Sequence, residues 1–535
     1  MAIPSSVLAI GWIPFVVVLT LSLIFAFCYI RFYQHHELSE VSCTLISVVA
    51  LFITFLTTIL VPVDVFLASF MKSSDGFFKS WAQDPSARAS MQETVTYAYY
   101  TLYGCIALFI FIILPFMYFF YEEKDDDETS SSRACTSLKY TAVFLLLALV
   151  VLVTGAFVPL RAPPSNVTSA GDKLSYLKEE LKVYTHAEQC ISVMVGVLSL
   201  FGITLLAFYT GYGLSALPLK MLSCCKGNTA EEEDGPVTNG LSRRERDETR
   251  ARMLRAKANS GRNLTRWERN QLRRIEEDER LRRRNERRRR NAKNSICGKI
   301  SLILAPFRAL FGVLMLLLSL LIMTAIVITS IDKSRNSLGY KYGYALPKPT
   351  IFNPLNELML FLQQVFPLDY LLYLGIVLFL FFATMTGLKR IGIWCCCVRM
   401  YKIRPQRTMP QALLLMIFMM MLIVVAINVL LFTMAPQYTS FGSQHFVGNT
   451  SSGLLKKQIC STESPPDECE MTRMAVLLNK LFYKAWFFGV YYYYAQWCLI
   501  GVFVIGFIVS LIKCKEPDYD EADPEDSDEE QLITA

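Results

Sequence analysis

Long runs of apolar residues alternate along the chain with shorter polar segments. A helix needs about 20 apolar residues to cross a hydrocarbon core about 30 Å thick, so each run of that length predicts a membrane-spanning helix. Nine runs qualify, at residues 7–30, 43–63, 95–120, 140–160, 189–211, 309–331, 368–388, 411–434 and 486–512. The pattern predicts an all-α, polytopic integral membrane protein with about nine transmembrane helices. The first run is too long for the apolar core of a signal peptide, and we expect it to be kept as a span.

The distribution of charge divides the chain further. Of the 535 residues 53% are apolar and 19% charged, and about half of the 53 Lys and Arg lie between Lys220 and Arg308. We therefore expect four regions: spans one to five in residues 1–217, a basic helical cytosolic insertion at 218–300, spans six to nine in 301–512, and a disordered acidic cytosolic tail at 513–535.

The basic insertion contains two patterns typical of helix starts. Ser242-Arg-Arg-Glu245 and Thr265-Arg-Trp-Glu268 each have the spacing of a capping box, so two helices are expected there. The later arginines alternate with glutamates and have no zinc ligands or stacking aromatics beside them, which argues against nucleic-acid binding. Attraction to an anionic membrane surface is the simpler interpretation, with a protein-docking helix as the alternative.

Basic residues close to the span ends predict the orientation. With nine spans the two termini lie on opposite sides of the membrane. A count over the short loops alone favours an inner N-terminus. However, RLRRRNERRRRNAKNSICGK before the sixth span and LKRIGIWCCCVRMYKIRPQR after the seventh are strong inner anchors. We therefore expect an outer, lumenal N-terminus and a cytosolic C-terminus, with residues 31–42, 122–139, 212–308 and 389–410 on the inner side.

Cysteines and glycosylation sequons fit this orientation. Cys460 and Cys469 form a separated pair in an outer loop, which favours a disulfide over two free thiols. The inner cysteines are candidates for palmitoylation or are simply small apolar residues near an interface: Cys224, Cys225, Cys395, Cys396 and Cys397. The sequons at Asn166 and Asn449 fall in outer loops and predict N-glycosylation, whereas the sequon at Asn263 lies on the inner side and should stay unmodified.

The acidic tail contains a candidate sorting signal. Asp528 precedes the apolar pair Leu532 and Ile533 by four residues. This spacing resembles the acidic dileucine signal that clathrin adaptors bind, in which the apolar pair fills a pocket and the acid meets a basic patch.

The chain lacks the motifs of several enzyme classes. No HExxH, GxSxG or Walker-type GxxxxGK[ST] sequence is present, and apart from the adjacent His35 and His36 the histidines lie in or near separate loops. We expect neither catalysis nor a metal site, and any ATP must be used by a partner.

Two proline-aspartate motifs mark the outer ends of spans. They are Pro62-Val-Asp64, where the second span ends, and Pro367-Leu-Asp369, where the seventh begins. Prolines in or near spans could mark the broken helices of a transporter, or simply stand where a proline costs little. Asp369 should lie in a first helical turn, where the helix dipole favours its charge. Asp64 has no such placement unless a helix starts there, so it is the better functional candidate at the membrane boundary.

Several strings together point to a family. They are LVPVDVF, YYTLYG, PFMYFFYEEKDDD, GLSALPL, NPLNELMLFLQQVFPLDY, GIW followed by RMYKIRPQRTMPQALL, and MAPQY. In this order they resemble the limb-region and lipocalin-receptor-like membrane protein family, through nearly all nine spans and less so in 225–295 and the tail.

The resemblance implies a lysosomal, non-enzymatic membrane protein that helps to move cobalamin from the lysosome lumen to the cytosol. It implies an ATP-binding-cassette transporter as partner, escorted from the endoplasmic reticulum, and cytosolic cobalamin-processing proteins as further partners. It implies no covalently bound cofactor, with cobalamin as a transported ligand. Two alternatives stay open: a cobalamin transporter or channel in its own right, and an endocytic adaptor for a receptor at the plasma membrane. The receptor role rests on tyrosine-based signals, and residues 218–300 contain no tyrosine. Homo-oligomerisation also stays open.

Overall fold

The computed structural model describes most of both transmembrane regions. The described residues are 5–35, 40–73, 75–123, 130–157, 186–229, 305–337 and 339–513. The last range has short gaps at 341–342, 345, 347–349, 366, 396–397, 402, 404, 407, 450–454, 462–463, 466–467 and 485. Within them, nine helices are long and apolar enough to cross a membrane, so the predicted all-α membrane fold is confirmed. The chain divides into two compact units, Met1–Leu217 with Leu317–Ala535, and Pro218–Leu316.

The helices follow the apolar runs. They are α1 (Ser5–Tyr33), α2 (Val41–Phe70), α3 (Pro85–Leu108), α4 (Leu114–Glu122), α5 (Ser130–Phe157), α7 (His186–Thr229), α11 (Ala305–Asn336), α12 (Pro354–Leu362), α13 (Leu368–Ile391), α14 (Pro410–Met434), α15 (Pro436–Phe441), α16 (Arg473–Lys484) and α17 (Trp486–Lys513). Two antiparallel hairpins complete the fold, β1 (Ile393–Cys395) with β2 (Val398–Tyr401), and β3 (His445–Asn449) with β4 (Leu455–Ile459).

The prolines inside spans do not divide them. Helix α2 continues through Pro62 to Phe70, seven residues beyond the predicted end of the second span. A π-helical turn at Phe109–Ile113 precedes Pro115 and joins α3 to α4. Proline has no backbone N–H to donate, and a π-helical turn lets the span continue despite this missing hydrogen bond. Pro367 stands just before α13, where it interrupts nothing.

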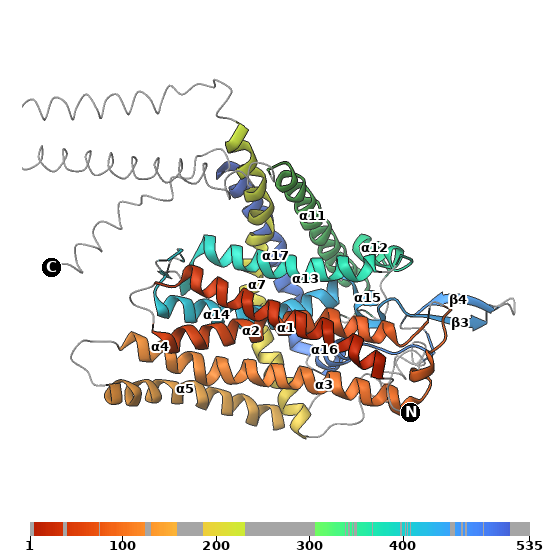
Figure 1. The fold of residues 1–535 in the computed structure, drawn as a ribbon, viewed down its shortest axis with the longest axis horizontal. Helices are drawn as coiled ribbons and strands as arrows, with labels where there is room; N and C mark the ends of the chain where they lie inside the picture. Colours follow the sequence, from red (N-terminus) through yellow and green to blue (C-terminus); the bar gives the residue numbers. More distant parts are fainter. Residues whose placement is uncertain are drawn as a thin grey trace, which may run out of the picture. The chain divides into compact units, whose positions relative to one another are not determined.

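Helix α14 is the core of the larger unit. It is apolar on all sides, and 89% of its apolar window is buried, against 17% for α5. A helix that is hydrophobic all round is a buried one. Helices α2, α4 and α13 pack around it, and Figure 1 shows them roughly parallel to α14. The apolar side chains that α5 leaves exposed suit a lipid environment.

Helices α7 and α13 cross at very short range. A Cβ added to Gly213 would lie 1.9 Å from the carbonyl oxygen of Ala383, and one added to Gly387 would lie 1.9 Å from that of Tyr209. Close by, the hydroxyls of Thr210 and Thr384 are 2.8 Å apart and hydrogen-bonded. Small residues that let two backbones approach, with a hydroxyl pair across the contact, are typical of helix packing in membranes.

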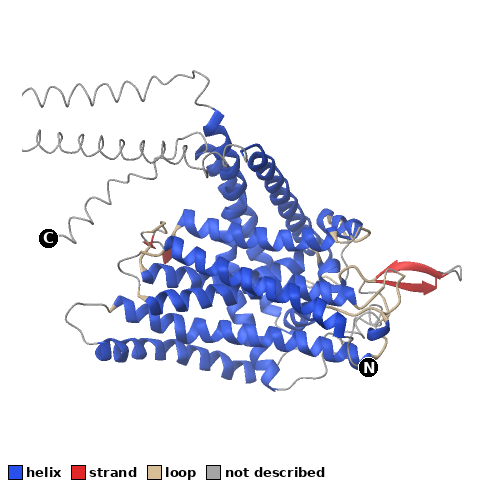
Figure 2. Ribbon diagram, in the orientation of Figure 1, coloured by secondary structure: helices blue, strands red, loops and turns tan. Residues whose placement is uncertain are grey.

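Three segments predicted to be inner meet at one end of the larger unit. The His35 backbone N–H donates to the carbonyl of Thr408 over 3.0 Å, which joins the α1–α2 connection to the segment after β2. The Tyr401 hydroxyl donates to Glu122 over 3.4 Å, which adds the end of α4. Figure 2 shows the β3–β4 hairpin at the opposite end from β1–β2. The connections predicted to be inner therefore lie together at one end, and the β3–β4 connection lies at the other. Spans that cross a membrane in alternating directions require this arrangement.

Candidate functional site

Both proline-aspartate motifs place a carboxylate inside the packed bundle. Asp64 lies within α2 with 3% of its surface exposed, and Asp369 lies in the first turn of α13 with 1% exposed. Burial of a carboxylate is costly unless hydrogen-bond donors replace the lost water. The donors that each aspartate receives therefore indicate its role.

Asp64 receives its donors from the start of another helix. Its carboxylate accepts the backbone N–H of Met474 over 2.8 Å and that of Arg473 over 3.3 Å, which are the first two residues of α16. Thr472 accepts the next free N–H, from Ala475, over 3.3 Å. The first N–H groups of a helix have no partner within it, and its N-terminus favours negative charge. Asp64 therefore caps α16 from a neighbouring helix.

Asp369 is less completely paired. Its Oδ2 accepts a hydrogen bond from the Tyr438 hydroxyl over 3.0 Å. Its Oδ1 is buried and has no hydrogen-bond partner among the residues that the structure describes. Asp369 lies in the first turn of α13, as the sequence predicts, and Asp64 also has a structural role. No new helix starts at Asp64, but α16 supplies the favourable N-terminus instead.

Four buried tyrosines accompany the two carboxylates. Tyr99 donates to Asp64 over 3.2 Å and stacks on Tyr103. Tyr438, the partner of Asp369, packs against Tyr373 with ring centroids 5.4 Å apart. Asn428 of α14 donates to the Tyr103 hydroxyl over 3.0 Å. The two motifs, 305 positions apart in the sequence, lie on helices α2 and α13, which pack together, and periodicity alone could not reveal this.

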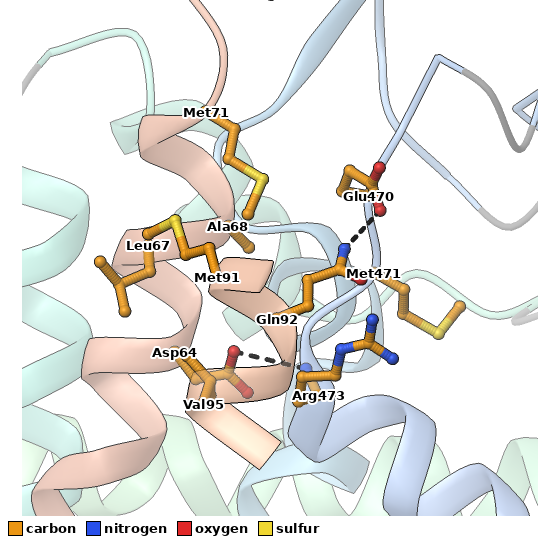
Figure 3. Close-up of a pocket in the computed structure, with 10 residues that line it drawn as sticks. All are labelled: Asp64, Leu67, Ala68, Met71, Met91, Gln92, Val95, Glu470, Met471 and Arg473. Carbon is orange, nitrogen blue, oxygen red and sulfur yellow. Dashed lines mark hydrogen bonds between the residues drawn. The ribbon is translucent and has the colours of Figure 1, made fainter. Parts of the chain in front are cut away.

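A small pocket opens beside Asp64. Figure 3 shows its lining, in which Asp64 and Val95 lie below Met71 and Met91, and Gln92 reaches Glu470 over 2.5 Å. The pocket has room for about one water molecule. It can hold neither a corrinoid nor a continuous aqueous path.

A third buried carboxylate was missed by the sequence analysis. Asp332, near the end of α11, is 3% exposed and accepts the Thr350 backbone N–H over 2.9 Å and the Asn336 amide over 2.7 Å. Its hydrogen bonds fix the start of the segment that leads into α12. The sequence ITSIDKS contained a signal for this residue, because Asp332 directly follows the sixth apolar run. Asp64 follows the second apolar run in the same way.

Ion pairs join the connection after α2 and the start of α3 to the segment before α16. Arg88 and Glu470 are 3.1 Å apart, and Lys72 and Glu468 are 3.7 Å apart. Both cations lie over the ring of Phe78. Burial lowers the pKa of Lys72, and the carboxylate of Glu468 opposes that shift. These contacts hold α16, and with it the cap on Asp64, against the ends of α2 and α3.

The other candidate residues are spread over the fold. A disulfide joins Cys460 to Cys469, both buried, in the segment between β4 and α16. Asn449 ends β3, Cys224 and Cys225 lie in α7, and Cys395 ends β1. Six candidates lie outside the described residues: Asn166, Cys396, Cys397, Asp528, Leu532 and Ile533. Within the described part of the chain, no group of three His, Cys, Asp or Glu side chains could hold a metal ion.

Known proteins resemble this chain over its full length. The LMBR1-like membrane protein family matches residues 11–297. A probable lysosomal cobalamin transporter of Nematostella vectensis is 44% identical, covering 100% of each chain. The lysosomal cobalamin transport escort protein LMBD1 of Danio rerio is 37% identical over 99% of this chain and 98% of its own. The protein of that name from Homo sapiens is 36% identical over 98% and 97%.

No solved structure matches the chain. The family match covers more than half of the sequence, and the relatives are matched from end to end. The chain belongs to the LMBR1-like membrane protein family.

Proposed function

We propose that this protein serves the export of cobalamin from the lysosome to the cytosol, as a non-enzymatic escort that binds and stabilises an ATP-binding-cassette cobalamin transporter. The observation that carries the proposal is the full-length match to relatives named lysosomal cobalamin transport escort protein. The absence of a nucleotide-binding motif from the sequence agrees with a partner that uses the ATP.

The packing of the larger unit supports an escort over a carrier. The central helix α14 has contacts on all sides, and the pocket beside Asp64 has room for about one water molecule. The carboxylate of Asp64 is occupied by three donors from within the protein. A carboxylate that binds a transported group needs to present its oxygens to that group.

Transport by this chain itself is the second candidate. It is favoured by the name of the Nematostella vectensis relative, a probable lysosomal cobalamin transporter. Asp369, with one oxygen unpaired within the described residues, would then be the better residue to line a path.

Reconstitution separates the two candidates. We expect liposomes that contain only this chain to take up no labelled cobalamin, and liposomes that also contain the transporter and ATP to take it up. The chain should raise the amount of active transporter, measured as ATP hydrolysis per mole of transporter after heating. Uptake by this chain alone would establish it as a transporter.

We place the N-terminus in the lumen and the C-terminus in the cytosol, after passage through the endoplasmic reticulum. This orientation puts the sequons at Asn166 and Asn449 in the lumen, where they can be glycosylated. Removal of glycans should therefore shift the protein on a gel, and Asn166→Gln and Asn449→Gln should each abolish one shift. Asn263→Gln serves as the matched control and should change nothing; a glycan on Asn263 would reverse the topology.

The two cytosolic regions supply the remaining contacts in this proposal. Residues 218–300 lie on the inner membrane surface and are available to a cytosolic cobalamin-processing protein. The tail, residues 513–535, binds a clathrin adaptor through Asp528, Leu532 and Ile533. Adaptor binding that persists after Leu532 and Ile533 are changed to alanine would remove this signal from the proposal.

A further inference from the structure

His445 connects the β3–β4 hairpin to the start of the seventh span. It is the first residue of β3, lies opposite Ile459 of β4, and is half-buried. Its side chain faces Gln363, which follows α12 and precedes the Pro367-Leu-Asp369 motif. His445 is one of the four histidines of the chain.

The hydrogen bonds of His445 fit a neutral ring. Its Nδ1 lies 3.0 Å from the carbonyl oxygen of Ser443, which can only accept, so Nδ1 carries a proton. Its Nε2 lies 3.4 Å from the amide nitrogen of Gln363, which can only donate, so Nε2 presents its lone pair. A proton added to Nε2 would place two donors face to face.

The surrounding charges oppose that proton as well. Burial lowers the pKa of His445, and the positive charges of Lys457 on β4 and Lys72 after α2 lower it further. The Ser443 carbonyl acts in the opposite direction. Glu468 is paired with Lys72, and the Tyr370 hydroxyl bonds to the Ser443 hydroxyl. A charged imidazole would therefore stand between two cations.

We propose that His445 is an acid-responsive latch, which holds the β3–β4 hairpin to the α12–α13 connection when neutral and releases the hairpin when protonated. A two-stranded hairpin is only marginally stable alone, so its order depends on contacts with the rest of the protein, which include the packing of Phe446 against Cys460 and Cys469 and the His445 contact. Partners that bind this end of the protein would meet a closed hairpin at neutral pH and a loosened one in acid.

The direction of the effect follows from proton linkage. The pKa of His445 is lower in the closed form than in the open chain, where it is about 6.5. The open form therefore binds more protons, and the stabilisation is complete above about pH 6.5 and lost as the pH falls below that value. Under the topology proposed above, the latch would be closed in the endoplasmic reticulum and open in the lysosome; this assignment of compartments rests on the proposed function.

Hydrogen exchange on the full-length purified protein tests the latch. After correction for the intrinsic rate, exchange of the backbone amides in β3 and β4 should be several-fold faster at about pH 5 than at about pH 7.5. In His445→Gln, which stays neutral and can still donate to Ser443, the two corrected rates should agree. Equal protection of the hairpin at both values in the wild type, as rotation of the Gln363 amide would give, overturns the proposal.

Two further variants sharpen the test. In Gln363→Glu a carboxylate would face the imidazole and favour its charged form, so the acid response should disappear or reverse. His35→Gln, at the opposite end, is the matched control and should keep the wild-type response. A response that persists in His445→Gln would also overturn the latch. These measurements need neither transport nor a known membrane orientation, so their failure is distinguishable from failure of the proposed function.

Discussion

Replacing Gly387 with alanine should prevent α7 and α13 from packing at their native distance. The added Cβ would lie 1.9 Å from the Tyr209 carbonyl oxygen, well inside van der Waals contact, and the obstacle is backbone that cannot rotate away. The helices would have to separate, which would also break the hydrogen bond between Thr210 and Thr384. We expect a cost above about 3 kcal/mol, visible as a large fall in the thermal unfolding temperature or as loss of folded protein.

The same helix offers a matched control. Gly375 also lies in α13, and a Cβ added there meets nothing within 4 Å. Gly375→Ala should therefore be neutral or stabilise the helix by up to about 1 kcal/mol, because alanine has the higher helix propensity. If both alanine variants unfold at the wild-type temperature, the close crossing does not exist as described.

Removing the carboxylate of Asp64 should have the second largest effect. Asp64→Ala would leave the N–H groups of Arg473 and Met474 and the hydroxyl of Tyr99 buried without an acceptor. The expected loss is about 3–5 kcal/mol of unfolding free energy. Asp64→Asn keeps one acceptor but loses the charge at the N-terminus of α16, and should cost about 1–2 kcal/mol.

Asp369→Ala is the comparison, since it removes the acceptor of the Tyr438 hydroxyl but leaves the N-terminal cap of α16 in place. Thermal unfolding of the variants in detergent should rank Asp64→Ala below Asp369→Ala. A fully stable Asp64→Ala that no longer supports cobalamin export would contradict the capping role and restore Asp64 as a functional carboxylate.

The spans were predictable because lipid imposes a simple rule on them. A segment that crosses the membrane must satisfy its own backbone and present apolar side chains for about 20 residues. The run at 411–434 meets that requirement because it is apolar almost throughout, and α14 covers Pro410–Met434. The residues at which the spans end were harder to predict. The apolar run predicted an end near residue 63, but α2 continues through Pro62 to Phe70, with Val61, Asp64 and Val65 buried.

The candidate site depended on contacts between distant parts of the chain. Sequence identified Asp64 and Asp369 by their chemistry, and placed Asp369 in a first helical turn. It could not show that Met474, 410 residues later, donates to Asp64. Nor could it place Tyr99 and Tyr438 against the two carboxylates, since Tyr99 lies in an apolar run that is typical of ordinary core and Tyr438 lies beyond the eighth run. Asp332 was not predicted as a buried carboxylate, because an acid beside Lys333 is typical of the polar end of a span.

The burial of α14 has a consequence for biogenesis. It is the eighth of the nine candidate spans in the described chain, yet α2, α4 and α13, all made earlier, pack around it. A ribosome delivers spans in order from the N-terminus. The faces of α2 and α4 that contact α14 therefore enter the bilayer long before their partner is synthesised. Those faces are without their native partner until Met434 has emerged from the ribosome.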